Sequence, residues 1–151
     1  MVKEARIYLA DESKAAIVVA MHHNFAGLYY EQENPITISN WRDSPELALA
    51  LRSALHRFSL CDRNLRELKS SDWTAYRVSR CRSVREFQGT YLRISVRAAN
   101  EAELCYIAEA QPLDEDEVSL HILVDRIGDE EITRRLLRLY DVCSRWSSIA
   151  I

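Results

Sequence analysis

Three runs of alternating apolar and polar residues constrain the fold of this chain more than any other feature of its sequence. They cover residues 91–97, 104–110 and 118–124. In the first run, leucine, isoleucine and valine occupy every second position, with arginine and serine between them. A period of two is typical of a strand with one buried face. The connections are shorter than the dozen residues that a parallel crossover needs, so the runs predict an antiparallel three-strand meander.

Shorter apolar runs in the first third of the chain predict further strands. They lie at residues 6–9, 15–21, 28–31 and 36–39, bounded by polar and turn-favouring residues. The run 15–21 is apolar throughout, which fits a helix as well as a strand. Its β-branched residues favour the strand, because such side chains suit a pleated surface.

Helices are predicted at about 44–59, 72–88 and 129–144. The first begins at Ser44 and Pro45, which suit a helix start, and continues with an apolar stripe at intervals of three and four residues. The third begins with acidic residues, has arginines further on and carries a similar stripe, an arrangement that suits the helix dipole.

The middle helical segment contains a second start signal. Asp72 is a candidate cap, the residues from Ser83 to Glu86 match a reciprocal capping box, and Gly89 is a candidate stop. We therefore expect two short helical pieces with a joint near Arg82. The expected core positions of this part of the chain are Trp73, Val84, Phe87, Leu92, Ile94 and Val96.

The composition is that of an ordinary globular protein. A chain of 151 residues, with 48% hydrophobic and 28% charged residues, predicts one α+β domain over residues 1–151, with a mainly antiparallel sheet packed by the three helical segments. The longest early apolar run, residues 15–21, is far shorter than the roughly 20 residues that span a bilayer. We therefore expect a cytoplasmic protein without a membrane segment.

The residues that usually carry chemistry are dispersed along the sequence. Adjacent His22 and His23 point to opposite faces of a strand, and His56 and His121 lie on other elements, so we predict no metal site. The four cysteines lack a paired spacing and are expected to be small apolar fillers: Cys61, Cys81, Cys105 and Cys143. The three glycines are isolated, which excludes phosphate-binding glycine loops. We predict no cofactor and no enzymatic activity.

Arginines are concentrated in the middle of the chain: Arg77, Arg80, Arg82, Arg85, Arg93 and Arg97. One interpretation is a surface for nucleic acid or for an acidic partner. The other, which we prefer, is a solvated helix face whose arginines pair with Glu86 and neighbouring acids. The net charge of −3 argues against nucleic acid as the main ligand.

Two acidic groups flank the second strand of the meander: Glu101, Glu103, Asp114, Glu115, Asp116 and Glu117. Loops that join successive strands lie at opposite ends of a meander, so the two groups need not merge. A carboxylate-rich surface can imitate phosphate and occupy the cationic cleft of a nuclease. The alternative is a solubilising loop.

One segment resembles a known family. The run from Trp73 through Ser79-Arg80-Cys81-Arg82-Ser83-Val84-Arg85-Glu86-Phe87, the strand 91–96 and the residues Asn100 and Glu103-Leu104 are similar to immunity proteins of contact-dependent growth inhibition systems. The resemblance extends more loosely to the helix 44–58, the strand 118–124 and the last helix. The matching positions determine the fold and include no catalytic ones.

The resemblance implies a small cytoplasmic bacterial protein that binds and neutralises the C-terminal toxin domain of a cognate effector. Because such toxins are often nucleases, the six acidic residues named above are our candidate toxin contacts. The alternatives are a small nucleic-acid-binding or regulatory module and an enzyme whose site is assembled in space.

Overall fold

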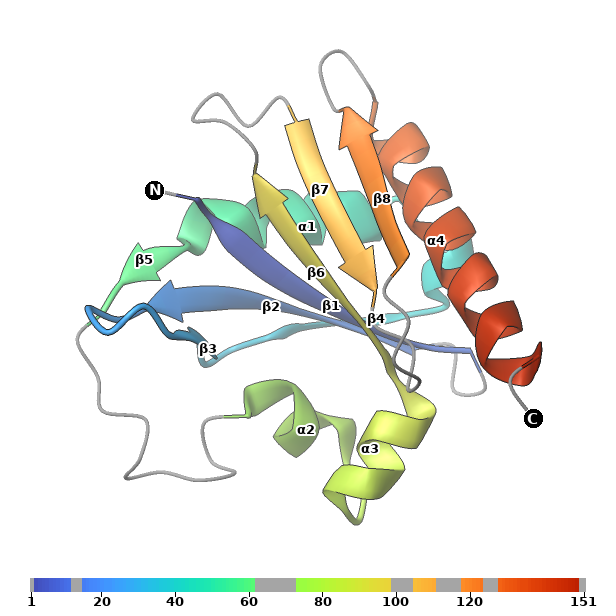
Figure 1. Ribbon diagram of the computed structural model, residues 1–151, viewed down its shortest axis with the longest axis horizontal. Coiled ribbons are helices and arrows are strands. Elements are labelled where there is room, and N and C mark those ends of the chain that lie inside the picture. Colours follow the sequence, from blue (N-terminus) through green and yellow to red (C-terminus); the bar gives the residue numbers. More distant parts are fainter. Residues whose placement is uncertain are drawn as a thin grey trace.

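A mostly antiparallel sheet forms the middle of the fold (Figure 1). The computed structural model describes residues 2–11, 15–61, 73–98, 105–110, 118–123 and 128–149. The strands are β1 (Glu4–Ala10), β2 (Ala15–His23), β3 (Tyr29–Glu31), β4 (Ile36–Ser39), β5 (Ser59–Leu60), β6 (Leu92–Ala98), β7 (Cys105–Ala110) and β8 (Val118–Leu123). The helices are α1 (Glu46–Arg57), α2 (Thr74–Ser79), α3 (Val84–Thr90) and α4 (Asp129–Ile149), with a 3-10 turn at Trp41–Asp43.

The strand order joins the N-terminal strands and the C-terminal meander in one sheet. The order is β3-β2-β1-β6-β7-β8, and β4 and β5 each pair with β2. Strands β6, β7 and β8 form the antiparallel meander that the alternating runs predict. The α+β class with a mainly antiparallel sheet is therefore confirmed. The short strand β5, which runs parallel to β2, and the 3-10 turn have no counterpart in the sequence prediction.

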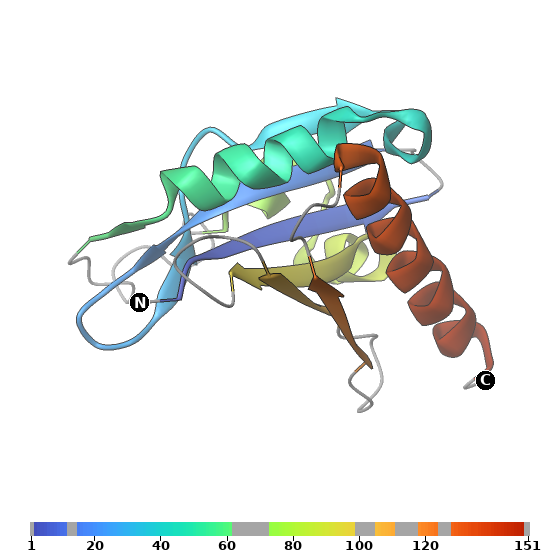
Figure 2. The same cartoon turned by 90° about the horizontal axis from the view of Figure 1, so that it is seen from above.

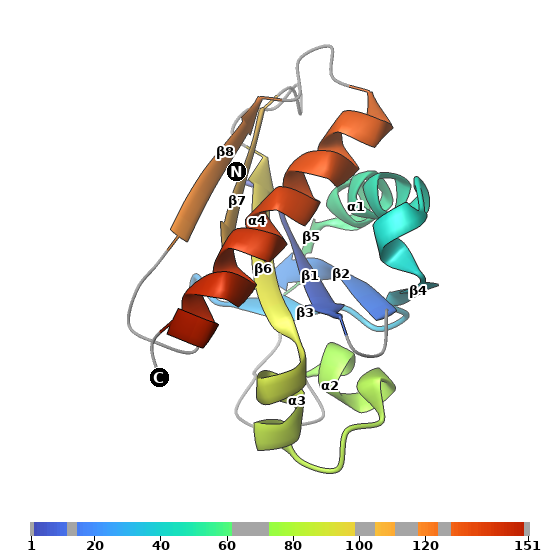
Figure 3. The ribbon, with the colours of Figure 1, turned by 90° about the vertical axis from the view of Figure 1, so that its right-hand side faces the viewer.

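Helices α1 and α4 cover the first face of the sheet. They contact each other and lie along the same side of the strands (Figures 2 and 3). Their predicted stripes are buried in the larger core, where they meet the alternate residues Ala5, Ile7 and Leu9 of β1. The side chain of Ser44 accepts a hydrogen bond from the amide of Glu46 at 3.1 Å, as expected for the start of α1. Helix α4 continues to Ile149, five residues beyond the predicted end at 144.

Helices α2 and α3 cover part of the second face and lie away from α1 and α4 (Figures 1 and 3). A smaller core forms beneath them from Tyr8 of β1, Ile17 and Val19 of β2, Ala75 and Phe87. Strand β2 is thus buried on both faces. Its uninterrupted apolar sequence follows from this position, because neither face of the strand meets water.

The helical segment predicted at 72–88 is two helices with a joint at residues 80–83, as the second start signal indicates. Arg80 ends α2 in the left-handed conformation, with φ 61. Ser83 accepts the amide of Glu86 at 3.1 Å, but the carboxylate of Glu86 reaches the amide of Arg82 at 2.6 Å, so the capping box is shifted by one residue. Gly89 lies inside α3, which ends at Thr90.

Three of the six expected core positions are not fully buried. Val84 is 37% exposed, so its assignment to the core is wrong. Val84 is the first residue of α3, and Phe87, one turn later, is the residue of this helix that is buried. Trp73 and Leu92 are half-buried and pack against the two cores, while Phe87, Ile94 and Val96 are fully buried. Within the residues that the structure describes, no helix has the length and apolar character needed to cross a membrane.

Candidate functional site

The six acidic candidates lie outside the described residues: Glu101, Glu103, Asp114, Glu115, Asp116 and Glu117. The strands that they connect are described. Strand β7 runs antiparallel to β6 and to β8, so residues 99–104 and 111–117 join it at opposite ends.

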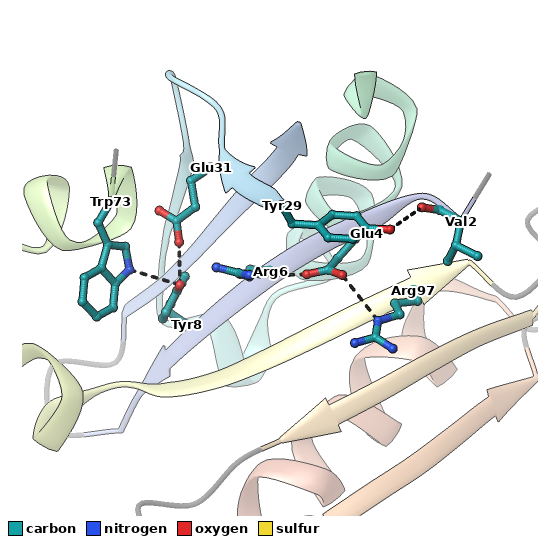
Figure 4. Close-up of polar contacts among 8 residues, drawn as sticks. All are labelled: Val2, Glu4, Arg6, Tyr8, Tyr29, Glu31, Trp73 and Arg97. Atoms are coloured by element: carbon teal, nitrogen blue, oxygen red, sulfur yellow. Dashed lines mark hydrogen bonds and ion pairs between the residues drawn. The ribbon is translucent and has the colours of Figure 1, made fainter. Parts of the chain in front are cut away.

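A buried polar network connects the sheet to α2 (Figure 4). The hydroxyl of Tyr8 donates to Oε1 of Glu31 at 2.5 Å, and Nε1 of Trp73 donates to that hydroxyl at 3.2 Å. The amide of Ala75, in the first turn of α2, donates to Oε2 of Glu31 at 2.8 Å. Both carboxylate oxygens are therefore bonded to groups on other elements, and Glu31 supplies the cap that α2 does not receive from its own N-cap residue.

Burial sets the proton affinity of this network. Desolvation raises the pKa of Glu31 above its ordinary value, while the amide of Ala75, the hydroxyl of Tyr8 and the nearby Arg6 and Arg93 oppose that rise. Desolvation and the charge of Glu31 raise the pKa of Tyr8 well above its usual range. A carboxyl with a raised pKa beside a tyrosine can act as a general acid or base. Glu31, however, is 3% exposed and bonded on both oxygens, so its role in this structure is to hold α2 on the sheet.

A second buried carboxylate, that of Glu4, lies on the face of β1 that also carries Tyr8. Glu4, whose side chain is 5% exposed, accepts from Nε of Arg6 and from Nε of Arg97 at 3.4 Å each (Figure 4). The backbone register places Glu4 opposite Arg97 and Tyr8 opposite Arg93. The arginines of β6 thus lie beside buried acids. Their positive charges offset part of the cost of desolvating those acids.

The arginines of α2 and α3 have different surroundings. Arg77, Arg80, Arg82 and Arg85 are exposed, and in the described part of the chain their guanidinium groups form no ion pair. The carboxylate of Glu86, their expected partner, is used to cap α3. The prediction that these arginines pair with Glu86 is therefore wrong, and the single basic group of the sequence divides into two groups.

His22 and His23, the last two residues of β2, contact different neighbours. Nδ1 of His22 lies 2.7 Å from the hydroxyl oxygen of Ser59, and the ring of His22 contacts that of Tyr30 in a tilted arrangement, as His23 contacts Tyr29. These contacts hold β5 and β3 on either side of the end of β2. Among the described residues, no three histidine, cysteine or acidic side chains come together as a metal site.

The cysteines divide by burial. Cys143 is buried in the larger core, and Cys81 packs against the smaller one, so both are apolar fillers as expected. Cys61 follows β5 and is exposed, so this interpretation is wrong for it. The side chain of Cys105 lies outside the described residues.

Sequence reasoning missed the buried acids and Tyr8. The signal was present in β1, where Glu4, Arg6 and Tyr8 alternate with the apolar residues that face α1. The partners of these residues could not be predicted in the same way, because Glu31, Trp73 and Arg97 lie 23 to 93 residues from them along the chain.

Comparisons with known proteins identify a similar fold. No protein-family model matches the sequence, and no curated protein matches it. Among solved structures, the chain is similar to a protein of unknown function from Neisseria meningitidis, NMB0488, with a TM-score of 0.62 and 16% sequence identity. The similarity covers 89% of this chain and 90% of that chain. The two proteins therefore share an architecture, and the chain has a fold that is known in a bacterial protein.

Proposed function

We propose that this protein is an immunity protein of a bacterial contact-dependent growth inhibition system. It acts in the cytoplasm, where it binds and neutralises the C-terminal toxin domain of a cognate effector, expected to be a nuclease. Such a role needs a rigid scaffold with a complementary surface, since inhibition follows from occupying the toxin.

The observation that carries the proposal is the packing of the segment that resembles immunity proteins. Trp73, Tyr76 and Tyr91 from this segment surround Phe87, with ring centroids 5.1–5.8 Å from its ring. The ring of Tyr8 joins them at 5.2 Å. The aromatic residues of this segment thus build one core between α2, α3 and the sheet, which supports a scaffold role for them.

The candidate contacts remain the acidic residues of the meander connections. A carboxylate-rich segment can imitate phosphate in a basic cleft that binds nucleic acid, and a charge reversal in it replaces attraction by repulsion. We expect Asp114→Lys/Asp116→Lys to weaken binding to the toxin domain at least about tenfold, the scale expected for close charge pairs at an interface.

The test is co-expression of the full chain with the toxin domain of the effector encoded beside its gene, read as growth, together with titration of the two purified proteins. Growth rescue and a stable complex support the proposal. Unrelieved toxicity without a complex rejects it. Glu33→Lys/Glu46→Lys, at two exposed acids far from the meander in sequence, is the matched control because it makes the same change in net charge. Equal weakening by both variants would exclude the acidic connections as the specific contact.

A further inference from the structure

The outer surface of α2 and α3 has a charge opposite to that of the whole molecule. Between Trp73 and Tyr91 the chain carries four arginines and one glutamate, a formal charge of +3, whereas the net charge of the protein is −3. The four arginines are Arg77, Arg80, Arg82 and Arg85, and all are exposed. We call this set the α2–α3 arginine surface.

Its arginines differ from others on the described surface, which mostly pair with acids: Arg42 with Asp11 and Asp141, Arg52 with Asp129, and Arg134 and Arg135 with Glu131. The side chains of the α2–α3 arginine surface form no ion pair within the described residues. Like charges close together without counter-charges repel one another and lower stability. An anionic partner would remove that repulsion and satisfy the guanidinium donors.

The backbone that carries these arginines is held firmly in place. Glu31 fixes the start of α2, and the hydroxyl of Ser79 bridges the carbonyl of Tyr76 at 2.6 Å and the amide of Cys81 at 3.2 Å at its end. Phe87 anchors α3 in the aromatic core. Fixed positions reduce the ordering cost when a partner binds, which favours a defined interface.

The surroundings favour a protein over a nucleic acid as the partner. Val78 is 39% exposed and Val84 is 37% exposed, and each is next to an arginine in the sequence, so exposed apolar side chains belong to the same two helices. Protein interfaces combine arginine with apolar contacts, whereas a phosphate backbone offers such side chains little to cover. The neighbouring rings of Trp73, Tyr76 and Tyr91 pack on Phe87, and single-strand binding requires rings that are open to bases.

We propose that the α2–α3 arginine surface is a docking site for an acidic segment of a protein partner, in which carboxylates meet the arginines and apolar side chains cover Val78 and Val84. This site is basic and lies at residues 77–85, whereas the candidate toxin contacts are acidic and lie at residues 101–117. The proposal does not depend on the partner being a toxin.

The test uses the full chain and a fluorescein-labelled synthetic peptide with glutamates at every third or fourth position and leucines between them. Anisotropy titrations at low salt compare this peptide with duplex DNA and single-stranded RNA of equal length. We expect the peptide to bind more tightly than either nucleic acid, and Arg77→Glu or Arg85→Glu to weaken its binding about fivefold or more. Arg138→Glu, at an exposed arginine of α4, is the matched control and should change binding less than about twofold.

Three results would overturn the proposal. The first is the absence of peptide binding by the wild-type chain. The second is equal loss in Arg85→Glu and Arg138→Glu, which would show general electrostatic attraction. The third is tighter binding of DNA or RNA, lost in Arg77→Glu and Arg85→Glu, which would identify a nucleic-acid site. Circular dichroism spectra that match the wild type show that each variant is folded. Because the probe is a peptide, the result is separate from the toxin assay.

Discussion

Glu31 and Tyr8 are bonded to each other although their strands are not neighbours. Strand β2 lies between β3 and β1, and the two side chains meet above it on the second face of the sheet, with 2.5 Å between Oε1 and the tyrosine hydroxyl. The other carboxylate oxygen binds the amide of Ala75 in α2. One side chain thus links three elements that are distant in sequence.

The first prediction concerns removal of that link. We expect Glu31→Ala to lower the free energy of unfolding by about 3 kcal/mol, because it leaves the hydroxyl of Tyr8 and the amide of Ala75 buried without their acceptor. Urea unfolding followed by circular dichroism measures the change. Glu33→Ala, two residues away at an exposed position, should stay within about 0.5 kcal/mol of the wild type. Similar midpoints for the two variants would contradict the prediction.

The second prediction concerns pH. The pKa of Glu31 is raised above 4.5 in the folded protein, chiefly by burial, so above pH 4.5 the folded state holds this proton more tightly than the unfolded state does. The contribution of Glu31 to stability is therefore complete below pH 4.5 and is lost as the pH rises through the folded pKa. The carboxamide introduced by Glu31→Gln does not titrate in this pH range. We expect the stability of the wild type relative to Glu31→Gln to fall as the pH rises above 4.5 through the folded pKa, as measured by urea unfolding at several pH values. A constant difference would argue against the raised pKa.

The third prediction concerns the aromatic core. Phe87 is 1% exposed and lies within 5.8 Å, centroid to centroid, of four other aromatic rings. We expect Phe87→Ala to cost about 3–5 kcal/mol of unfolding free energy, because the cavity that it leaves cannot close fully. Val84→Ala on the same helix is the control and should cost less than about 1 kcal/mol, since Val84 is largely outside the core. Comparable losses would mean that α3 is rotated relative to the structure described above.

The fourth prediction concerns Glu131 at the start of α4. Hydrogen bonds from Arg134 and Arg135 lower its pKa to about 2. Its contribution to stability is therefore present above pH 4.5 and is lost as the pH falls toward 2. Carbon-detected NMR titration of the carboxyl should give a midpoint well below 4.5. In Arg134→Gln/Arg135→Gln the midpoint should return toward 4.5, and high salt should have a similar effect on this exposed group.

Much of the fold could be predicted because its signals are local. The strands of the meander and the stripes of α1 and α4 each repeat within a few residues, and where the structure describes side-chain burial, in β6, α1 and α4, the predicted apolar positions are mostly buried. The double-sided burial of β2 was harder to predict, because an apolar run does not show what covers it. Val84 was misassigned because a spacing of three residues places it on the same side of a helix as Phe87, whereas it begins α3 and is 37% exposed.

The candidate site was predicted less well, and the reason is physical. The acidic residues of the meander connections stay a prediction. The arginine group was recognised in the sequence, but its predicted pairing with Glu86 was wrong. Whether an arginine has a counter-charge depends on which acids remain available after folding, and Glu86 is used as a cap.

The sequence by itself determined the helices and the longer strands of this protein, since period and capping act over a few residues. Only the tertiary structure decided which polar groups are buried together. Glu31, Tyr8 and Trp73 are separated by as many as 65 residues and meet because the sheet order and the position of α2 bring them together. A buried donor or acceptor must find a partner in space, and sequence separation places no limit on which one it finds.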